Sequence, residues 1–359
     1  MTHALKKVLL ASTAALLPLA ASASETWFPY PAQAVEPAFS ADGELVPVEY
    51  VPLEAASQPW NICVSFPHMK DAYWLGVNYG VVDEARRLGV NMNVVEADGY
   101  TELPRQISQI EDCVSAGADA VVIGAISFDG LNSLIREVAA QGIPVIDVIN
   151  GVSSPDITAK SLVSFYTMGY QTGAYLAETH PAGSEEVTVG WFPGPAGAGW
   201  VEAAHRGFMD AVEGSAVRVL EPRYGDTGRE VQQRLVEDVL TASPDVRYIA
   251  GTAVTAEAAQ GIVRERGLRG QVDILAFYMT PGVYTGIERG FILGAPADSM
   301  VIQGRIAVDQ AVRALEGEDF IAHVGPEIFV VDQSNIGEVD RDTILPPENF
   351  SPVFSVRVD

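Results

Sequence analysis

The sequence predicts an α/β protein with two lobes, each a parallel sheet flanked by helices, and a cleft between the lobes. Short apolar segments alternate with amphipathic ones from residue 60 to residue 315. Such alternation is typical of βαβ units joined by right-handed crossovers. It comes as two series separated by a long loop at 151–164. A chain of 359 residues is also long enough for two domains.

The first series starts with an apolar strand at 60–66. Apolar residues then recur at helical spacing from Leu75 to Leu88, and Gly89 is expected to end that helix. The segment 118–124 is apolar throughout, as expected of a strand that a parallel sheet buries on both faces. The other elements expected here are a strand at 90–95, helices at 102–116 and 128–141, and a strand at 143–150.

The second series is expected to start with a helix at 166–180. Its strands are expected at 187–192, 216–223, 246–251, 272–277 and 291–295, with a last strand at 328–331. Its other helices are expected at 200–213, 228–242, 255–266, 282–289 and 299–315. We expect the chain to cross back near Gly294 to Asp298. Lobe one then comprises 60–150 and 295–359, and lobe two comprises 151–294.

The start of the chain has the features of a secretory signal at 1–23. Lys6 and Lys7 precede an apolar stretch, Val8–Ala20, and the small residues Ala21, Ser22 and Ala23 mark a cleavage site. A membrane anchor is the alternative, but the stretch is short for a span and contains Pro18. We therefore predict an exported protein without direct membrane insertion. Residues 24–59 are expected to form an irregular or strand-like extension lying on the first lobe.

Charge and motifs exclude several classes of function. The net charge is −25, or −27 once the two signal lysines are removed, and such a surface repels nucleic acid and anionic lipid. The sequence has no H-E-x-x-H, G-x-S-x-G or P-loop motif. His68 beside Asp71 is one candidate acid/base pair, although such pairs are more often loop contacts. We predict no enzymatic activity, no catalytic residue, no metal site and no cofactor.

Two smaller features leave alternatives open. Cys63 and Cys113 are an even pair in an exported chain, which suggests one disulfide, with two buried free thiols as the alternative. The run Gly194–Gly199 follows a strand like a dinucleotide-binding loop, but Pro193 and Pro195 interrupt the pattern. We interpret it as a loop that allows close approach at the rim of the cleft.

Aromatic residues at strand ends give the positive signal. Parallel sheets of this kind bind ligands at the carboxyl ends of their strands. The residues expected there are Asp71, Tyr73, Trp74, Tyr100, Phe165, Tyr166, Trp200 and Tyr278. Ring faces attract cations, so a cleft lined this way suits a small methylated cation or zwitterion. The alternatives are that Asp71 only caps a helix and that some rings only pack between the lobes.

Several stretches resemble a known family. They are Lys70–Leu75, Asn78–Gly80, Val95–Ala97, Met168–Gln171, Pro193–Pro195, Gly251–Ala253 and Phe277–Tyr278, together with Cys63 and Cys113. From about Trp60 to Phe354 the chain resembles the periplasmic binding proteins of trimethylamine N-oxide sensing systems. That family is related to the ribose-binding and LacI-type lobed proteins.

The resemblance implies a location, a ligand and a partner. The protein would be periplasmic and would hold trimethylamine N-oxide, or a close methylated amine, in an aromatic box. The residues that match the box are Asp71, Tyr73, Trp74, Tyr100 and Tyr278, and Phe165 stands where the family has Trp. The oxide would accept hydrogen bonds from the Trp74 N–H and a Tyr hydroxyl. The partner implied is the periplasmic sensor domain of a TorS-like membrane histidine kinase. The alternative function is a solute-binding protein that delivers a sugar-like ligand to an ABC transporter.

Overall fold

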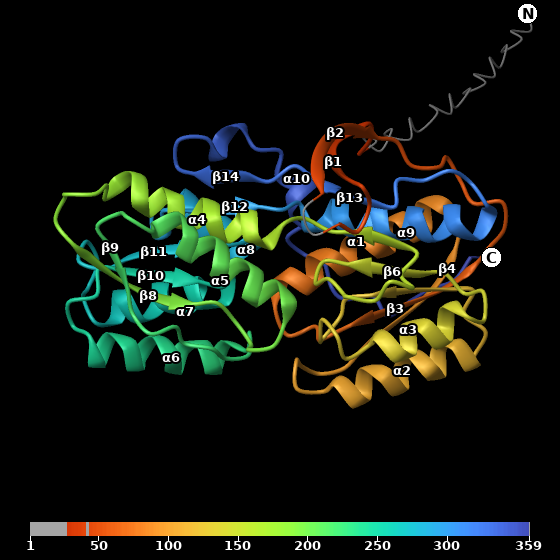
Figure 1. Cartoon of the computed structure of the whole chain (residues 1–359), viewed down its shortest axis with the longest axis horizontal. Helices are drawn as coiled ribbons and strands as arrows, with labels where there is room; N and C mark the ends of the chain where they lie inside the picture. Colours follow the sequence, from red (N-terminus) through yellow and green to blue (C-terminus); the bar gives the residue numbers. More distant parts are fainter. Residues whose placement is uncertain (1–26, 41–42, 359) are drawn as a thin grey trace, which may run out of the picture.

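The computed structural model describes residues 27–40 and 43–358, and it confirms two α/β lobes lying side by side (Figure 1). The predicted signal at 1–23 lies outside the described residues. One lobe contains a nine-stranded sheet and the other a four-stranded sheet. Within the described ranges, no helix has both the length and the apolar character needed to cross a membrane.

The nine-stranded sheet has the order β15-β4-β3-β5-β6-β7-β13-β1-β2. Strand β3 (Asn61–Phe66) pairs in parallel with β4 (Asn91–Glu96) and β5 (Ala120–Ile123), so that Val64 stands beside Val94 and Val122. Helices α1 (Ala72–Leu88) and α9 (Met300–Glu316) cover one face of the sheet. Helices α2 (Leu103–Ser115) and α3 (Asn132–Ala139) cover the other (Figure 1). The apolar strands are therefore buried on both faces, as their sequence predicts.

The N-terminal extension is part of this sheet. Strands β1 (Tyr30–Glu36) and β2 (Glu44–Tyr50) form an antiparallel hairpin, and β1 pairs with β13 (His323–Pro326). The side chain of Trp27 also donates a hydrogen bond to Glu84 in α1, at 3.0 Å. The extension thus adds two strands to the edge of the first sheet.

Three strands of the first sheet were not predicted. β7 (Ala159–Ser161) lies inside the predicted loop 151–164 and pairs in parallel with β6 (Val145–Val148) and β13. It is only three residues long, and its central Lys160 bonds to the Val152 carbonyl, so no apolar run marks it. β13 and β15 (Ser355–Val356) are also short, with four and two residues. Because β7 belongs to the first sheet, we propose that lobe two begins after Ser161, and not at residue 151.

The second sheet has the order β11-β10-β8-β9 and is parallel throughout. Its strands are β8 (Val187–Phe192), β9 (Val217–Val219), β10 (Tyr248–Gly251) and β11 (Asp273–Ala276). Its helices are α4 (Phe165–Thr179), α5 (Gly199–Val212), α6 (Arg229–Ala242), α7 (Ala253–Glu265) and α8 (Pro281–Glu288). These elements match the predicted series, although β9 is shorter than the strand expected at 216–223.

The return to the first lobe passes through a separate ribbon. β12 (Gly294–Ala297) pairs antiparallel with β14 (Phe329–Asp332), and the chain then enters α9. The tail adds a short 3-10 turn at Ile336–Glu338 and helix α10 (Arg341–Ile344). Asp298 and Ser299, both buried, form the connection between β12 and α9. This connection falls in the segment Gly294 to Asp298 at which the sequence places the crossover, and the exact lobe boundary stays a prediction.

The two cysteines form the disulfide that the sequence suggested. Cys63 in β3 is bonded to Cys113 in α2, and both side chains are buried. The bond holds α2 against β3 of the first sheet. The alternative of two free thiols was wrong.

Candidate ligand-binding site

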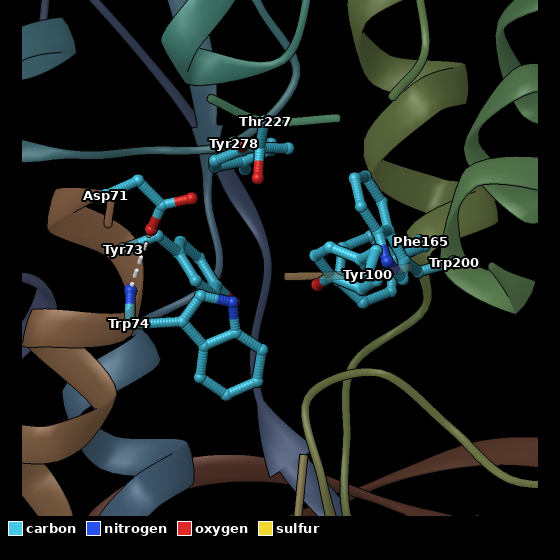
Figure 2. Close-up of a pocket in the computed structure, with 8 residues that line it drawn as sticks. All are labelled: Asp71, Tyr73, Trp74, Tyr100, Phe165, Trp200, Thr227 and Tyr278. Carbon is cyan, nitrogen blue, oxygen red and sulfur yellow. Dashed lines mark hydrogen bonds between the residues drawn. The ribbon is translucent and has the colours of Figure 1, made fainter. Parts of the chain in front are cut away.

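A small pocket lies between the two lobes (Figure 2). The structure brings all six predicted site residues together in its wall and adds two more. The eight lining residues are Asp71, Tyr73, Trp74, Tyr100, Phe165, Trp200, Thr227 and Tyr278. They come from segments that follow β3, β4, β7, β8, β9 and β11, at the carboxyl ends of the strands. The pocket therefore lies at the strand ends where the sequence predicts a ligand site, and ligand binding by these residues stays a prediction.

Asp71 has two roles in this geometry. It is the N-cap of α1, where its side chain accepts a hydrogen bond from the Trp74 backbone N–H at 3.1 Å. Its side chain is only 7% exposed, and it lines the pocket. Burial raises the pKa of Asp71, while the nearby His68 lowers it. Capping and pocket lining, which the sequence left as alternatives, therefore coexist.

His68 is buried beneath the pocket and connects the lobes. Its Nε2 lies 4.0 Å from the Asp71 carboxylate and 3.1 Å from the hydroxyl of Thr227, which precedes α6 of the second lobe. His68 is 1% exposed, so the pair with Asp71 is not a solvated loop contact. The His68–Thr227 hydrogen bond therefore joins a segment that follows β3 of the first sheet to one that follows β9 of the second.

Tyr73 joins the pocket to the crossover. Its hydroxyl donates a hydrogen bond to Oδ2 of Asp298, which also accepts one from Gln303 Nε2 at 3.0 Å. Asp298 is fully buried, and its Oδ1 has no hydrogen-bond partner. Burial raises the pKa of Asp298 to about 6, despite these hydrogen bonds.

The rings contact one another around the pocket. Tyr73 of the first lobe meets Tyr278 of the second edge to face, with ring centroids 5.1 Å apart. Trp200 lies 5.7 Å from Phe165 and 6.0 Å from Tyr100, again between ring centroids. Some rings therefore do pack between the lobes, and the same rings line the cavity. Tyr166 in α4 is not part of the pocket wall, since its exposed hydroxyl donates a hydrogen bond to Asp210 in α5.

Each tryptophan of the pocket lies against a glycine. A Cβ on Gly124, directly after β5, would meet the Trp74 ring at 2.4 Å. A Cβ on Gly194 would meet the Trp200 ring at 2.6 Å, and Gly194 also has a φ of +118°. Only glycine satisfies both the space and the backbone angle there. The glycine run at 194–199 is thus a close-approach loop, as interpreted from the sequence.

The pocket is small and nearly apolar. The centre of a water molecule could move through only about 20 Å³ of it. One water needs roughly 10–15 Å³ of such space. Asp71 and Thr227 are its only lining residues that are not aromatic. No group of three or more His, Cys, Asp or Glu side chains within the described ranges could hold a metal ion.

Sequence reasoning missed Thr227 as a site residue, and it noted Trp200 without including it. Thr227 is one hydroxyl in the polar loop Gly225–Gly228, and no ring or charge pattern distinguishes it. Its only signal was position, because the loop follows β9 at the same edge of the sheet as the other site residues. Trp200 carried the aromatic signal and is 5% exposed in the pocket wall.

Comparison with known proteins places this geometry in a family. Residues 62–319 match the family of the periplasmic binding protein domain. The periplasmic protein TorT of Escherichia coli strain K12 is 37% identical over 328 residues, which cover 89% of this chain and 93% of TorT.

Two solved structures are similar along most of the chain. An ABC transporter solute binding protein from Bradyrhizobium sp. BTAi1, crystallised with bound Bis-Tris, is 71% identical with a TM-score of 0.81, covering 92% of this chain and 100% of that one. The complex of the TorS sensor domain with TorT in the presence of trimethylamine N-oxide matches with 32% identity and a TM-score of 0.76, covering 82% and 99%. The resemblance seen in the sequence is thereby confirmed, and the chain belongs to the periplasmic binding protein family, among the relatives of TorT.

Proposed function

We propose that this protein binds trimethylamine N-oxide, or a close methylated amine, in the periplasm and signals to the periplasmic sensor domain of a TorS-like membrane histidine kinase. The observation that carries the proposal is the closed aromatic pocket with one buried carboxylate, Asp71. The relative TorT has been crystallised with the TorS sensor domain in the presence of this N-oxide.

The chemistry of the wall supports a methylated cationic nitrogen. Six of the eight lining residues are aromatic, and each ring face presents negative potential to such a nitrogen and its methyl groups. A desolvated ring contributes about 0.5–2 kcal/mol to binding of a cation. Asp71 adds a negative charge on one side, where it stabilises the positive end of a zwitterion.

The size of the pocket argues against a sugar. Sugar sites need several charged or amide side chains to pair with the hydroxyl groups, because unpaired buried polar groups are costly. Here the lining offers Asp71 and Thr227, and the free space is about 20 Å³. A lining of six rings and one carboxylate suits a compact methylated nitrogen better than a pyranose ring with its many hydroxyl groups.

The transport alternative keeps one specific observation in its favour. The relative that is 71% identical is described as an ABC transporter solute binding protein, and it holds Bis-Tris, a hydroxylated tertiary amine. An amine ligand is common to both interpretations, so they differ mainly in the partner. We also propose that the protein is not an enzyme, since the lining residues include no Ser, Cys or Lys nucleophile and no His.

Calorimetry with a ligand panel tests the proposed ligand. We expect trimethylamine N-oxide to bind more tightly than glycine betaine, choline, Bis-Tris or ribose. Binding of ribose but of no amine would contradict the proposal.

Size-exclusion chromatography tests the partner. We expect the ligand-bound protein to form a complex with the sensor domain of the kinase and not with a detergent-solubilised permease. Complex formation with the permease alone would establish the transport alternative.

A further inference from the structure

The indole N–H of Trp200 is a buried donor without a hydrogen-bond partner. Buried polar groups in proteins are hydrogen-bonded in about nine cases of ten. The tryptophans outside the pocket follow that rule. Trp27 and Trp60 each donate at 3.0 Å to a glutamate, and Trp191 donates to His205 at 3.1 Å. Trp200 departs from it, and it lines the pocket.

The surroundings of this N–H supply no acceptor. The rings around Trp200 are those of Tyr100, Phe165, Phe277 and Tyr278. The two phenylalanines have no polar side-chain atoms. The hydroxyl of Tyr100 already accepts from Asn150 at 3.0 Å and lies within hydrogen-bonding reach of Trp74. The indole N–H of Trp200, in contrast, is fully buried and has no hydrogen-bond partner among the described residues.

The ring of Trp200 cannot turn away to find a partner. Gly194 lies so close to the far edge of the ring that a Cβ on Gly194 would stand 2.6 Å from it. Trp200 is also the second residue of α5, so the helix holds its backbone in place. Phe165 packs against the ring from the start of α4. The glycine loop thus holds the ring in an orientation in which its N–H has no partner within the protein. A site that binds an external acceptor requires such a preorganised donor.

We propose that Trp200 is a specificity-determining residue whose Nε1 donates a hydrogen bond to an oxygen on the ligand. Figure 2 shows Asp71 and Trp200 on opposite sides of the pocket. The positive, methylated end of the ligand then faces Asp71 and Trp74, and its oxygen faces Trp200. The pocket selects a methylated ammonium that carries an oxygen over one of equal size without it. This inference rests on the proposed amine ligand.

An isosteric pair of ligands tests the inference. Trimethylamine N-oxide and tetramethylammonium have the same number of non-hydrogen atoms and differ by one oxygen against one methyl group. Trp200→Phe keeps a ring in the wall and removes the N–H. We expect the variant to bind the N-oxide about 5- to 30-fold more weakly than the native protein, the value of one buried hydrogen bond. Its affinity for tetramethylammonium should stay within about twofold.

Trp60→Phe is the matched control. It removes an indole N–H that donates to Glu316, away from the pocket, and should change neither affinity. An equal loss for both ligands in Trp200→Phe, or no loss for either, would overturn the role of Trp200. A native protein that binds neither ligand would overturn the proposed function as well, and the two failures are therefore distinct.

A measurement on the native protein covers the case in which Trp200→Phe does not fold. In a nitrogen-15 spectrum, the indole N–H signal of Trp200 should move downfield on addition of the N-oxide, as a proton does when it enters a hydrogen bond. Addition of tetramethylammonium should leave it near its free position. The same shift with both ligands would refute a hydrogen bond to the oxygen.

Discussion

Tyr73 donates a hydrogen bond to Asp298, and both residues are buried between the lobes. Tyr73 stands at the start of α1 and lines the pocket, whereas Asp298 belongs to the connection between β12 and α9. A pocket-lining residue of the first lobe is therefore joined directly to the segment that connects β12 with α9. Any change in the position of Tyr73 on ligand binding is transmitted to that connection through one hydrogen bond.

The raised pKa of Asp298 predicts a pH-dependent stability. Its pKa is about 6 in the folded protein and about 3.9 in an unfolded chain. Between these values the folded protein retains a proton that the unfolded chain has lost, so the contribution of this group to the free energy of unfolding falls as pH rises. Above about pH 6 the contribution of Asp298 to the free energy of unfolding no longer falls with pH.

Asp298→Asn removes this titration and keeps an oxygen for the Tyr73 hydroxyl. We expect the stability of the variant, relative to the native protein, to increase by roughly 2–3 kcal/mol between pH 4 and pH 7. Urea unfolding of both proteins at several pH values measures this difference. A difference that stays constant across the range would show that Asp298 does not titrate as stated.

Trp74→Ala should weaken binding of trimethylamine N-oxide more than Trp74→Phe does. The alanine variant loses the ring face on which the methyl groups pack, at a cost of roughly 1–3 kcal/mol, or about 5- to 150-fold in affinity. Phenylalanine keeps a ring above Gly124 and should retain most of the binding. Calorimetry gives both values, and circular dichroism confirms that the variants are folded. A folded Trp74→Ala protein with native affinity would rule out the aromatic box.

Thr227→Val should favour the open arrangement of the lobes. It preserves the shape of the side chain but removes the hydroxyl that bonds to His68 across the interface. We expect a larger radius of gyration without ligand in solution scattering, and about 3- to 30-fold weaker ligand binding.

Thr179→Val is the control for Thr227→Val, because its hydroxyl bonds only to the Tyr175 carbonyl within α4. An unchanged scattering profile and unchanged affinity in Thr227→Val would mean that the His68–Thr227 contact does not stabilise closure.

Removal of the disulfide should destabilise the first lobe. Cys63 and Cys113 are separated by 50 residues, and closing a loop of that length stabilises a protein by about 4 kcal/mol in the chain-entropy estimate. We expect the variant with both cysteines replaced by alanine to unfold at lower urea concentration by a corresponding amount. The reduced native protein should behave like the double variant. Equal stability of the variant and the oxidised native protein would contradict the estimate.

The sequence singled out residues of the pocket wall where position and residue type agree. Tyr73, Trp74 and Tyr278 are large rings directly after strong apolar strands, so the rule that ligands bind at strand ends located them. Thr227 follows β9, a strand of three residues, and a lone hydroxyl in a polar loop carries no compositional signal. The unmet donor of Trp200 depends on the exact orientation of its ring among its neighbours, which no spacing of residues encodes.

The strands show the same difference between elements that the residue pattern marks and elements that it does not. β3, β5 and β8 are apolar runs bounded by turn residues, and the sequence located each of them. β7 was missed because its central residue is Lys160, a buried lysine whose ammonium pairs with Asp147 and donates to the Val152 carbonyl. A strand stabilised by its neighbours and not by its own composition is invisible to a pattern of hydrophobic residues.

The positions of the strands along the chain determine which of the two sheets can be completed first as the chain leaves the secretion channel. The four strands of the second sheet lie within one continuous stretch, 187–276. The first sheet needs β1 near the beginning and β15 at Ser355–Val356, close to the end. A chain exported from its N-terminus can assemble the second sheet while the first still lacks strands at its edges. Until the last residues emerge, the open edge beside β4 is available to other chains, so shortening the C-terminus by a few residues should favour aggregation during export.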